Sequence, residues 1–247
     1  MTKTFDPHAS PNERSVDNGR RSFFVKLGAG ATALASTAVM AAPRGADDPA
    51  EKLALLEEER ALRKLHETFE RALDAGAYDE VVELFADDAQ VVFNNGVFAS
   101  RSGIGRLYRG RFREGKTGKR IEPAPGFGAE LERQQERVEV SADRSSAEAV
   151  FRYSMQVGAP IETETSLAGM ARLHGEGVRT WWEGGVYRVS YRKDADGRWK
   201  IGRLEYDTLA RADYRPGRTY AEAIAVAPIT TTYPHDPQGP DALVRRA

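Results

Sequence analysis

Apolar residues in the segment 51–73 recur three and four positions apart, on a background of Glu, Arg and Lys. The recurring residues are Leu55, Leu62, Leu65, Phe69, Ala72 and Leu73. Because this spacing places them on one face of a helix, the segment is predicted to be a long amphipathic helix. Asp74, Ala75 and Gly76 interrupt the pattern, and a second, shorter helix is expected over 78–85.

Beyond the second helix the pattern changes to the alternation that is typical of strands, with a tight turn expected at 94–96. A third short helix is expected over 103–112, and 113–128 is rich in Gly, Pro and Lys without periodicity, as is typical of a loop. The expected strands cover 90–93, 97–98, 131–140, 147–156, 180–193 and 198–206. Helices followed by hairpin-linked strands predict an α+β fold, in which a curved antiparallel sheet wraps on the long helix with two shorter helices.

The N-terminal region has a different pattern. Arg20 and Arg21 precede Ser22-Phe23, and a weakly apolar run of small residues follows over 27–42. This order predicts a cleavable leader over 1–42, because the run is too short for a membrane span. The string resembles the twin-arginine export signal, which implies a periplasmic or secreted protein that is delivered already folded. The predicted organisation is therefore a leader (1–42), a linker (43–50), a folded domain (51–207) and an extended tail (208–247).

The composition limits the chemistry. The chain has no cysteine, which suits an oxidising compartment, and its formal net charge of −1 argues against a nucleic-acid partner. No metal-ligand spacing, no phosphate-binding glycine loop and no Gly-x-Ser-x-Gly nucleophile motif is found outside the leader. We therefore predict no cofactor, no metal and, once the leader is removed, no stable insertion into a membrane.

Several strings resemble the nuclear transport factor 2-like superfamily, and more narrowly its SnoaL-like and ketosteroid-isomerase-like domains. They are Phe-Glu-Arg-Ala-Leu-Asp-Ala-Gly at 69–76, Leu-Phe-Ala-Asp-Asp-Ala at 84–89, Gly-Ile at 103–104, and the Gly- and Trp-containing strings at 184–188 and 196–201. The resemblance implies a cone-shaped fold that encloses a pocket for a small apolar or aromatic molecule. It also implies a homodimer formed through the outer face of the sheet.

The same resemblance suggests which residues could act in the pocket. The oxyanion-hole tyrosine and the Asp base of the ketosteroid isomerases fall at Phe69 and Phe93, neither of which can move a proton. The dehydratases and dehydrochlorinases of the superfamily pair a carboxylate with a histidine, and Asp74 stands at the carboxylate position, although an Asp before Ala-Gly also ends helices. No histidine occupies the expected partner position near 130–132, where Glu130 or Glu132 could serve as a carboxylate base.

Two histidines within the predicted domain are candidates for proton transfer. His66 shares the helix face of Leu62 and Phe69, so it is either a pocket residue or a hydrogen-bonded core histidine. His174 lies in the irregular segment 157–179, over the mouth of the pocket or in an exposed loop. Tyr153 or Tyr187 could donate a hydrogen bond to a developing oxyanion. The expected pocket lining comprises Phe69, Phe93, Tyr153, Trp181 and Tyr187.

These residues support two hypotheses of different classes. The first is an exported, cofactor-independent lyase or isomerase that acts on a small apolar or aromatic molecule, with Asp74, His66 and His174 as catalytic candidates. The second is a non-catalytic ligand-binding or dimerisation module with the same fold. They can be distinguished by whether the cavity brings a carboxylate and a proton-transfer group together.

Overall fold

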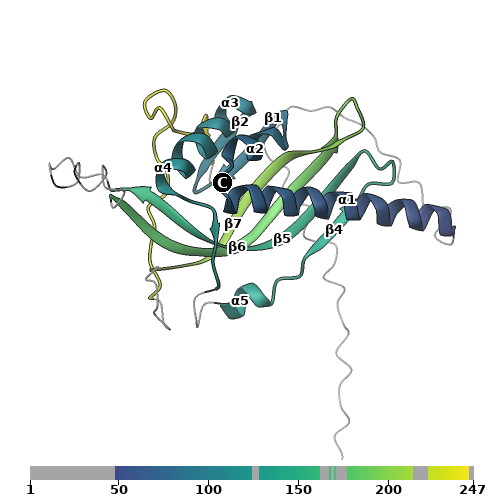
Figure 1. Ribbon diagram of the computed structural model, residues 1–247, viewed down its shortest axis with the longest axis horizontal. Helices are drawn as coiled ribbons and strands as arrows, with labels where there is room; N and C mark the ends of the chain where they lie inside the picture. The colour runs from purple at the N-terminus through teal and green to yellow at the C-terminus, as the bar shows by residue number, and fades with distance from the viewer. Residues whose placement is uncertain are drawn as a thin grey trace, which may run out of the picture. The chain divides into compact units, whose positions relative to one another are not determined.

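The long helix predicted from the leucine pattern is α1 (Pro49–Asp74), which starts two residues earlier than expected. Asp48 caps its N-terminus by accepting a hydrogen bond from the Ala50 amide at 3.0 Å. One face of α1 is buried, and Figure 1 shows the helix lying across β5, β6 and β7. The computed structural model describes residues 48–123, 128–161, 177–213 and 222–244, together with Leu167 and Met170. The predicted leader, most of the linker and His174 lie outside these residues.

Short helices follow α1 and cover one end of the sheet. The first is α2 (Tyr78–Glu83), which is shorter than predicted because Phe85 already begins a strand. The predicted third helix starts at Ser100 as α3 (Ser100–Gly105) and continues into the π-helical η2 (Arg106–Phe112) and α4 (Arg113–Gly115). Leu107, Tyr108 and Phe112 of η2 are buried, so this helical run packs its apolar face on the core.

Eight strands form one curved sheet in the order β3-β5-β6-β7-β1-β2-β8, with β4 also paired to β5. Their bounds are β1 (Phe85–Phe93), β2 (Gly96–Ala99), β3 (Lys119–Arg120), β4 (Arg137–Val140), β5 (Ser146–Pro160), β6 (Val178–Lys193), β7 (Trp199–Asp213) and β8 (Ala242–Leu243). The α+β class is confirmed. The sheet is mixed rather than wholly antiparallel, because β1 pairs in parallel with β7.

The predicted strand over 131–140 is only partly correct. Residues Gly128–Glu132 form the short helix α5, and only Arg137–Val140 is extended, as β4. The run Leu-Glu-Arg-Gln-Gln-Glu at 131–136 is rich in helix-forming residues and lacks an alternating apolar face, so it cannot present one side to the core. The expected loop over 113–128 likewise contains α4 and the two-residue strand β3.

The predicted tail contributes to the sheet. Strand β7 continues to Asp213, and β8 pairs with β2, whose edge would otherwise expose unpaired backbone groups. Asp241 accepts a hydrogen bond from the Ala99 amide at 2.8 Å and forms an ion pair with Arg106. Residues 222–226 of the predicted tail are not helical, and Ala223 forms an isolated bridge with Ala212.

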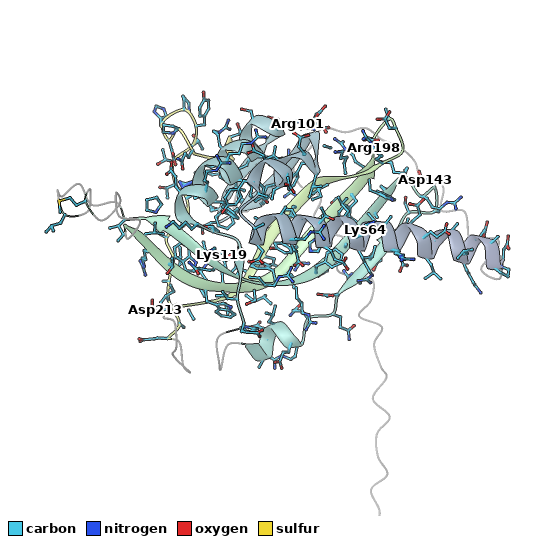
Figure 2. The ribbon with its side chains drawn as sticks, viewed as in Figure 1. Lys64, Arg101, Lys119, Asp143, Arg198 and Asp213 are labelled. Atoms are coloured by element: carbon cyan, nitrogen blue, oxygen red, sulfur yellow. The ribbon has the colours of Figure 1, made fainter. Side chains whose placement is uncertain are left out.

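Some of the charged residues labelled in Figure 2 lie at the ends of strands. Asp143 lies in the β4–β5 turn and Arg198 in the β6–β7 turn, at one end of the sheet, and Asp213 lies at the opposite end of β7. The concave face between them is packed with aromatic rings, several of which are completely buried. Within the described residues no helix is both long and apolar enough to cross a membrane.

Candidate functional site

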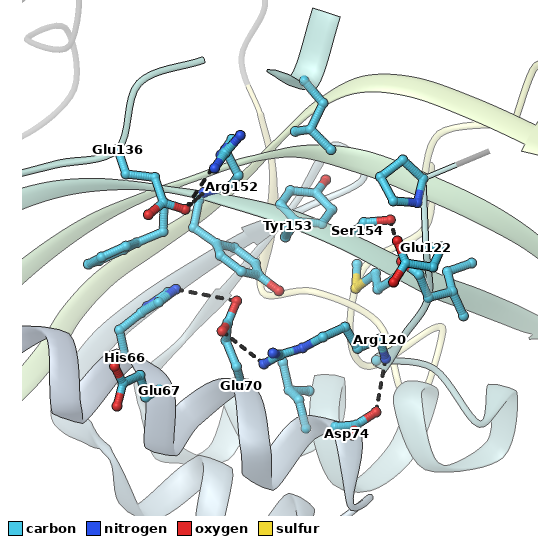
Figure 3. Close-up of a pocket in the computed structure, with 18 of the residues that line it drawn as sticks. His66, Glu67, Glu70, Asp74, Arg120, Glu122, Glu136, Arg152, Tyr153 and Ser154 are labelled. Carbon is cyan, nitrogen blue, oxygen red and sulfur yellow. Dashed lines mark hydrogen bonds and ion pairs between the residues drawn. The ribbon is translucent and has the colours of Figure 1, made fainter. Parts of the chain in front are cut away.

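A cavity of about 770 Å³ opens between the C-terminal half of α1, strand β5 and the segment from β3 to β4 (Figure 3). Strands β3 and β4 both pair with β5, at Met155–Gln156 and at Ala147–Val150, so the edge of β5 between them is left without a neighbouring strand. Glu136 partly closes this edge, because its carboxylate accepts a hydrogen bond from the Arg152 amide at 3.2 Å. The cavity is large enough for a small organic molecule.

His66 forms part of the inner wall of this cavity and is only 3% exposed. Its Nδ1 lies 3.2 Å from the Tyr191 hydroxyl, and its ring stacks on Phe151 with centroids 3.8 Å apart. Burial, with a smaller contribution from the positive charge of Arg120, lowers the pKa of His66 to about 3, so the ring is neutral at neutral pH. Its Nε2 has no hydrogen-bond partner among the described residues.

Glu70 lies one helical turn after His66 and is half-buried. Its Oε1 is 3.8 Å from His66 Nε2, and its Oε2 accepts a hydrogen bond from the Arg120 guanidinium at 2.9 Å (Figure 3). Burial raises the pKa of Glu70 above its usual range, and Arg120 only partly opposes this shift. The carboxylate repels a ring lone pair and attracts an N–H, so we assign the single proton of neutral His66 to Nε2, with the Tyr191 hydroxyl donating to Nδ1.

The segment that carries Arg120 is fixed to the sheet from two sides. Gly115 and Gly158 approach so closely that a Cβ on Gly115 would lie 2.1 Å from the Gly158 carbonyl oxygen. Thr117 donates a hydrogen bond to that oxygen at 3.1 Å and accepts one from the Gly158 amide at 3.0 Å. On the other side, Asp74 accepts a hydrogen bond from the Arg120 amide at 3.0 Å. These contacts hold the Arg120 guanidinium beside Glu70.

The two tyrosines expected in the pocket both line it, but their hydroxyl groups differ. The Tyr153 hydroxyl donates to the buried Glu183 carboxylate at 3.0 Å, so its proton is directed away from the cavity. The Tyr187 hydroxyl has no hydrogen bond within the part of the chain that the structure describes. Burial, followed by the negative charge of Glu70, raises the pKa of Tyr187 well above its usual range, so the group stays protonated and can donate.

The other predicted site residues lie elsewhere. Asp74 is at the exposed rim of the cavity, bonded to the Arg120 amide rather than to a histidine or tyrosine. Phe69 and Phe93 are packed in the core, as is Trp181, and none of the three lines this cavity. His174 lies outside the described residues. Of the alternative bases, Glu132 lines the cavity and is exposed, whereas Glu130 does not line it.

The described residues contain no group of three or more His, Asp or Glu side chains arranged to hold a metal ion. The inner cavity instead combines a carboxylate, a guanidinium, a neutral imidazole and a free phenol, held by α1, β3 and β6. This set can remove a proton at Glu70 and stabilise developing negative charge with the His66 N–H, the Tyr187 hydroxyl or Arg120.

A sequence profile for the SnoaL-like domain matches residues 54–205, which is more than half of the chain. The chain belongs to the SnoaL-like family. Its fold is the nuclear transport factor 2-like fold that the resemblance implied, with a curved mixed sheet and helices. No curated protein sequence matches the chain at a significant level.

Solved structures resemble this SnoaL-like domain at low sequence identity. One is LinA, which is 14% identical over 70% of this chain and 99% of its own, with a TM-score of 0.48. Another is a nuclear transport factor 2-like superfamily protein from Salmonella enterica, 13% identical over 66% of this chain and 99% of its own, TM-score 0.46. A third is an NTF2-like protein with a cystatin-like fold from Novosphingobium aromaticivorans. It is 19% identical over 67% of this chain and 92% of its own, with a TM-score of 0.41. At these sequence identities and TM-scores, the likeness carries no argument about the activity of this chain.

Glu70 and Arg120, which form the ion pair of the SnoaL-like cavity, were not among the candidates from the sequence. Glu70 could have been found, because it stands four positions after His66 on α1 and the two side chains of such a pair meet on one helix face. Arg120 carries no local signal, since it stands in a Gly- and Pro-rich stretch. Its place beside Glu70 depends on the pairing of β3 with β5.

The neutral, buried state of His66 predicts a loss of stability in mild acid. Its folded pKa of about 3 lies below the ordinary value near 6.5, so the unfolded chain takes up a proton first as the pH falls. This group stabilises the folded state fully above pH 6.5, and the contribution is lost between pH 6.5 and 3. At pH 5 the loss is on the order of 2 kcal/mol.

The measurement is urea unfolding of the wild type and of His66→Phe at pH 7 and pH 5. The variant should show a much smaller pH-dependent change, while the opposite contribution of Glu70 is common to both proteins. An identical pH dependence in the two proteins would show that His66 is not neutral and buried.

Proposed function

We propose that this SnoaL-like domain is a cofactor-independent acid–base enzyme of the lyase or isomerase type, acting on a small organic molecule, with Glu70 as the general base. The observation that carries the proposal is the half-buried Glu70 carboxylate, which faces the cavity between His66 and Arg120. Burial raises the pKa of Glu70, which makes it a stronger base than an exposed carboxylate.

In the proposed reaction Glu70 takes a proton from a carbon atom of the substrate. The electron pair that is left either expels a leaving group from the neighbouring carbon, which is a lyase reaction, or shifts a double bond, after which Glu70 returns the proton at a new position. The Nε2–H of His66 and the Tyr187 hydroxyl are placed to donate to an oxygen atom that gains negative charge. Tyr153 does not take this role, because Glu183 accepts its proton.

One observation favours a non-catalytic binding module as the second candidate. Asp74, at the position where the enzymes that the chain resembles carry their carboxylate, forms a hydrogen bond with a backbone amide and faces no histidine. In this alternative the Glu70–Arg120 ion pair only lines a ligand site.

The two candidates are separated by binding and turnover measured on the same molecules. The full chain is screened by thermal shift against small cyclic ketones, alcohols and halides, and each molecule that raises the melting temperature is then incubated with the protein and followed by NMR. Glu70-dependent conversion supports the enzyme. Saturable binding without conversion of any bound molecule supports the binding module and rejects the enzyme.

We also propose that the chain is exported by the twin-arginine pathway and works in the periplasm or outside the cell. The proposal rests on Arg20, Arg21 and the short apolar run that follows them. Changing both residues, Arg20→Lys and Arg21→Lys, should retain the full-length protein in the cytoplasm, as measured by cell fractionation and immunoblotting. Unchanged export of a shortened form would contradict the proposal.

A homodimer remains an expectation from the family resemblance. The outer sheet face that it would use carries polar pairs such as Arg188–Asp207 and Ser190–Glu148, so a dimer there would be held by polar contacts. Light scattering of the purified chain measures its mass directly.

A further inference from the structure

The lining of the cavity contains more acidic than basic side chains. Six carboxylates face it, against three guanidiniums. The carboxylates are Glu67, Glu70, Asp74, Glu122, Glu132 and Glu136, and the guanidiniums are Arg63, Arg120 and Arg152. His66 adds no positive charge, because its pKa of about 3 keeps it neutral. The chain as a whole has a formal net charge of only −1, so this excess is a local property of the cavity.

The excess charge is concentrated at the mouth. Arg120, whose side chain is 61% exposed, pairs with Glu70 at 2.9 Å, and at the edge of β5 Arg152 lies 3.7 Å from Glu136. Of the other four carboxylates, Asp74 accepts a hydrogen bond from the Arg120 amide, whereas Glu67, Glu122 and Glu132 form no ion pair within the described residues. They come from α1, from the residues after β3 and from α5, and Figure 3 shows Glu67 and Glu122 on opposite sides of the cavity.

Arg63, the remaining guanidinium, does not neutralise these carboxylates. It lies over the ring of Phe151, 6.0 Å from the centroid, and forms no ion pair among the described residues. The lining therefore holds three more carboxylates than guanidiniums.

The inner end of the cavity offers a ligand apolar surface and one hydrogen-bond donor. Phe151, Tyr153 and Met155 present apolar surface there. The Nε2 of His66 is more than nine-tenths buried and lacks a hydrogen-bond partner in the described part of the chain. A buried N–H without a partner costs free energy, which a ligand oxygen that accepts its hydrogen bond would recover.

We propose that the cavity takes a small organic amine, whose ammonium group is attracted by the carboxylates of the cavity mouth and whose inner part carries an oxygen atom that accepts the hydrogen bond of His66. This inference rests on the proposed function, because it names the substrate class of the same site. The hydrocarbon part of the molecule lies against Phe151 and Met155. Arg120 stays paired with Glu70, and the ammonium is attracted by the unpaired carboxylates at the mouth.

The test uses three probes with one carbon skeleton, namely phenethylamine, 2-phenylethanol and phenylacetate, titrated against the full chain by NMR at low ionic strength. The amine should bind about tenfold more tightly than the carboxylate, with the alcohol between them. Because the mouth carboxylates are exposed, about 0.5 M salt should remove most of the difference.

The variant that decides the proposal carries Glu67→Gln, Glu122→Gln and Glu132→Gln together. It should lose the preference for the amine, whereas the matched control Glu57→Gln with Glu80→Gln, two exposed carboxylates outside the cavity, should keep it. Equal binding of amine and carboxylate by the wild type, an unchanged preference in the triple variant, or no binding of any probe by the folded protein would overturn the proposal.

The same titrations separate this inference from the proposed function. Amine preference is measured in Glu70→Gln as well, where binding does not depend on turnover. An amine preference without turnover of any molecule rejects the enzyme and keeps the ligand class. If the protein turns over a substrate but binds the amine probe no more tightly than the carboxylate probe, the ligand class is rejected and the enzyme is kept.

Discussion

Replacing Glu70 by Gln should lower the turnover number by about 100- to 10 000-fold while leaving ligand binding in place. Gln has nearly the shape of Glu and can still accept a hydrogen bond from Arg120, but it cannot take a proton from carbon. The measurement is kcat on a substrate found in the screen, together with ligand affinity and the melting temperature of both proteins. A pH profile adds a second readout, since wild-type activity should fall as the pH drops through a pKa that burial has raised above the usual range of Glu.

Two further variants make this prediction specific to Glu70. Glu57→Gln changes an exposed carboxylate on the same helix, outside the cavity, and should leave kcat unchanged. Asp74→Asn tests the carboxylate that the family resemblance points to. If Asp74→Asn abolishes turnover and Glu70→Gln retains it, then Asp74 is the base and our assignment is wrong.

Replacing Arg211 by Met should lower the free energy of unfolding by about 3 kcal/mol. Arg211 donates to Glu183 at 2.7 Å, and Glu183 is only 1% exposed, so removing the guanidinium leaves a buried carboxylate with two neutral donors, Tyr153 and Thr208. Uncompensated burial of a charge is costly. We place the effect at the lower end of the usual range because Arg211 is partly exposed. The measurement is urea unfolding at neutral pH.

An exposed arginine provides the control for this prediction. Arg198 pairs with Asp194 and Asp196 in the β6–β7 turn with 70% of its side chain exposed, and Arg198→Met should cost less than about 0.5 kcal/mol. The double variant Arg211→Met with Glu183→Met should recover much of the lost stability, because both charges are then removed. Equal losses for Arg211→Met and Arg198→Met would show that the buried pair does not act as described.

Local patterns in the sequence predicted the elements whose stability depends on nearby residues. The leucine spacing predicted α1, and Asn94-Asn95 predicted the β1–β2 turn, where both residues adopt positive φ. The alternation over 147–156 and 180–193 predicted the two long central strands within a few residues of their ends. The segment 131–140 was predicted incorrectly in part, because a strand was extended into residues that favour a helix.

The site was less predictable than the fold. His66 and the tyrosines 153 and 187 line the cavity, and helix and strand periodicity had placed them on inward faces. The same reasoning placed Phe69, Phe93 and Trp181 on inward faces, where they pack in the core rather than along the cavity. Periodicity shows that a side chain points inward, but not whether other side chains fill the space before it.

The sequence by itself determined the α+β class, the long helix, the hairpin-linked strands and the family, because these depend on periodicity and on short strings of neighbouring residues. Only the tertiary structure decided the parallel pairing of β1 with β7, the addition of β8 to the sheet edge and the meeting of Glu70 with Arg120. Each of these joins residues 50 or more positions apart, and no local spacing encodes such a contact. They form because strand edges must be paired and a partly buried carboxylate is stabilised by a positive charge, and those requirements are met only once the whole chain has folded.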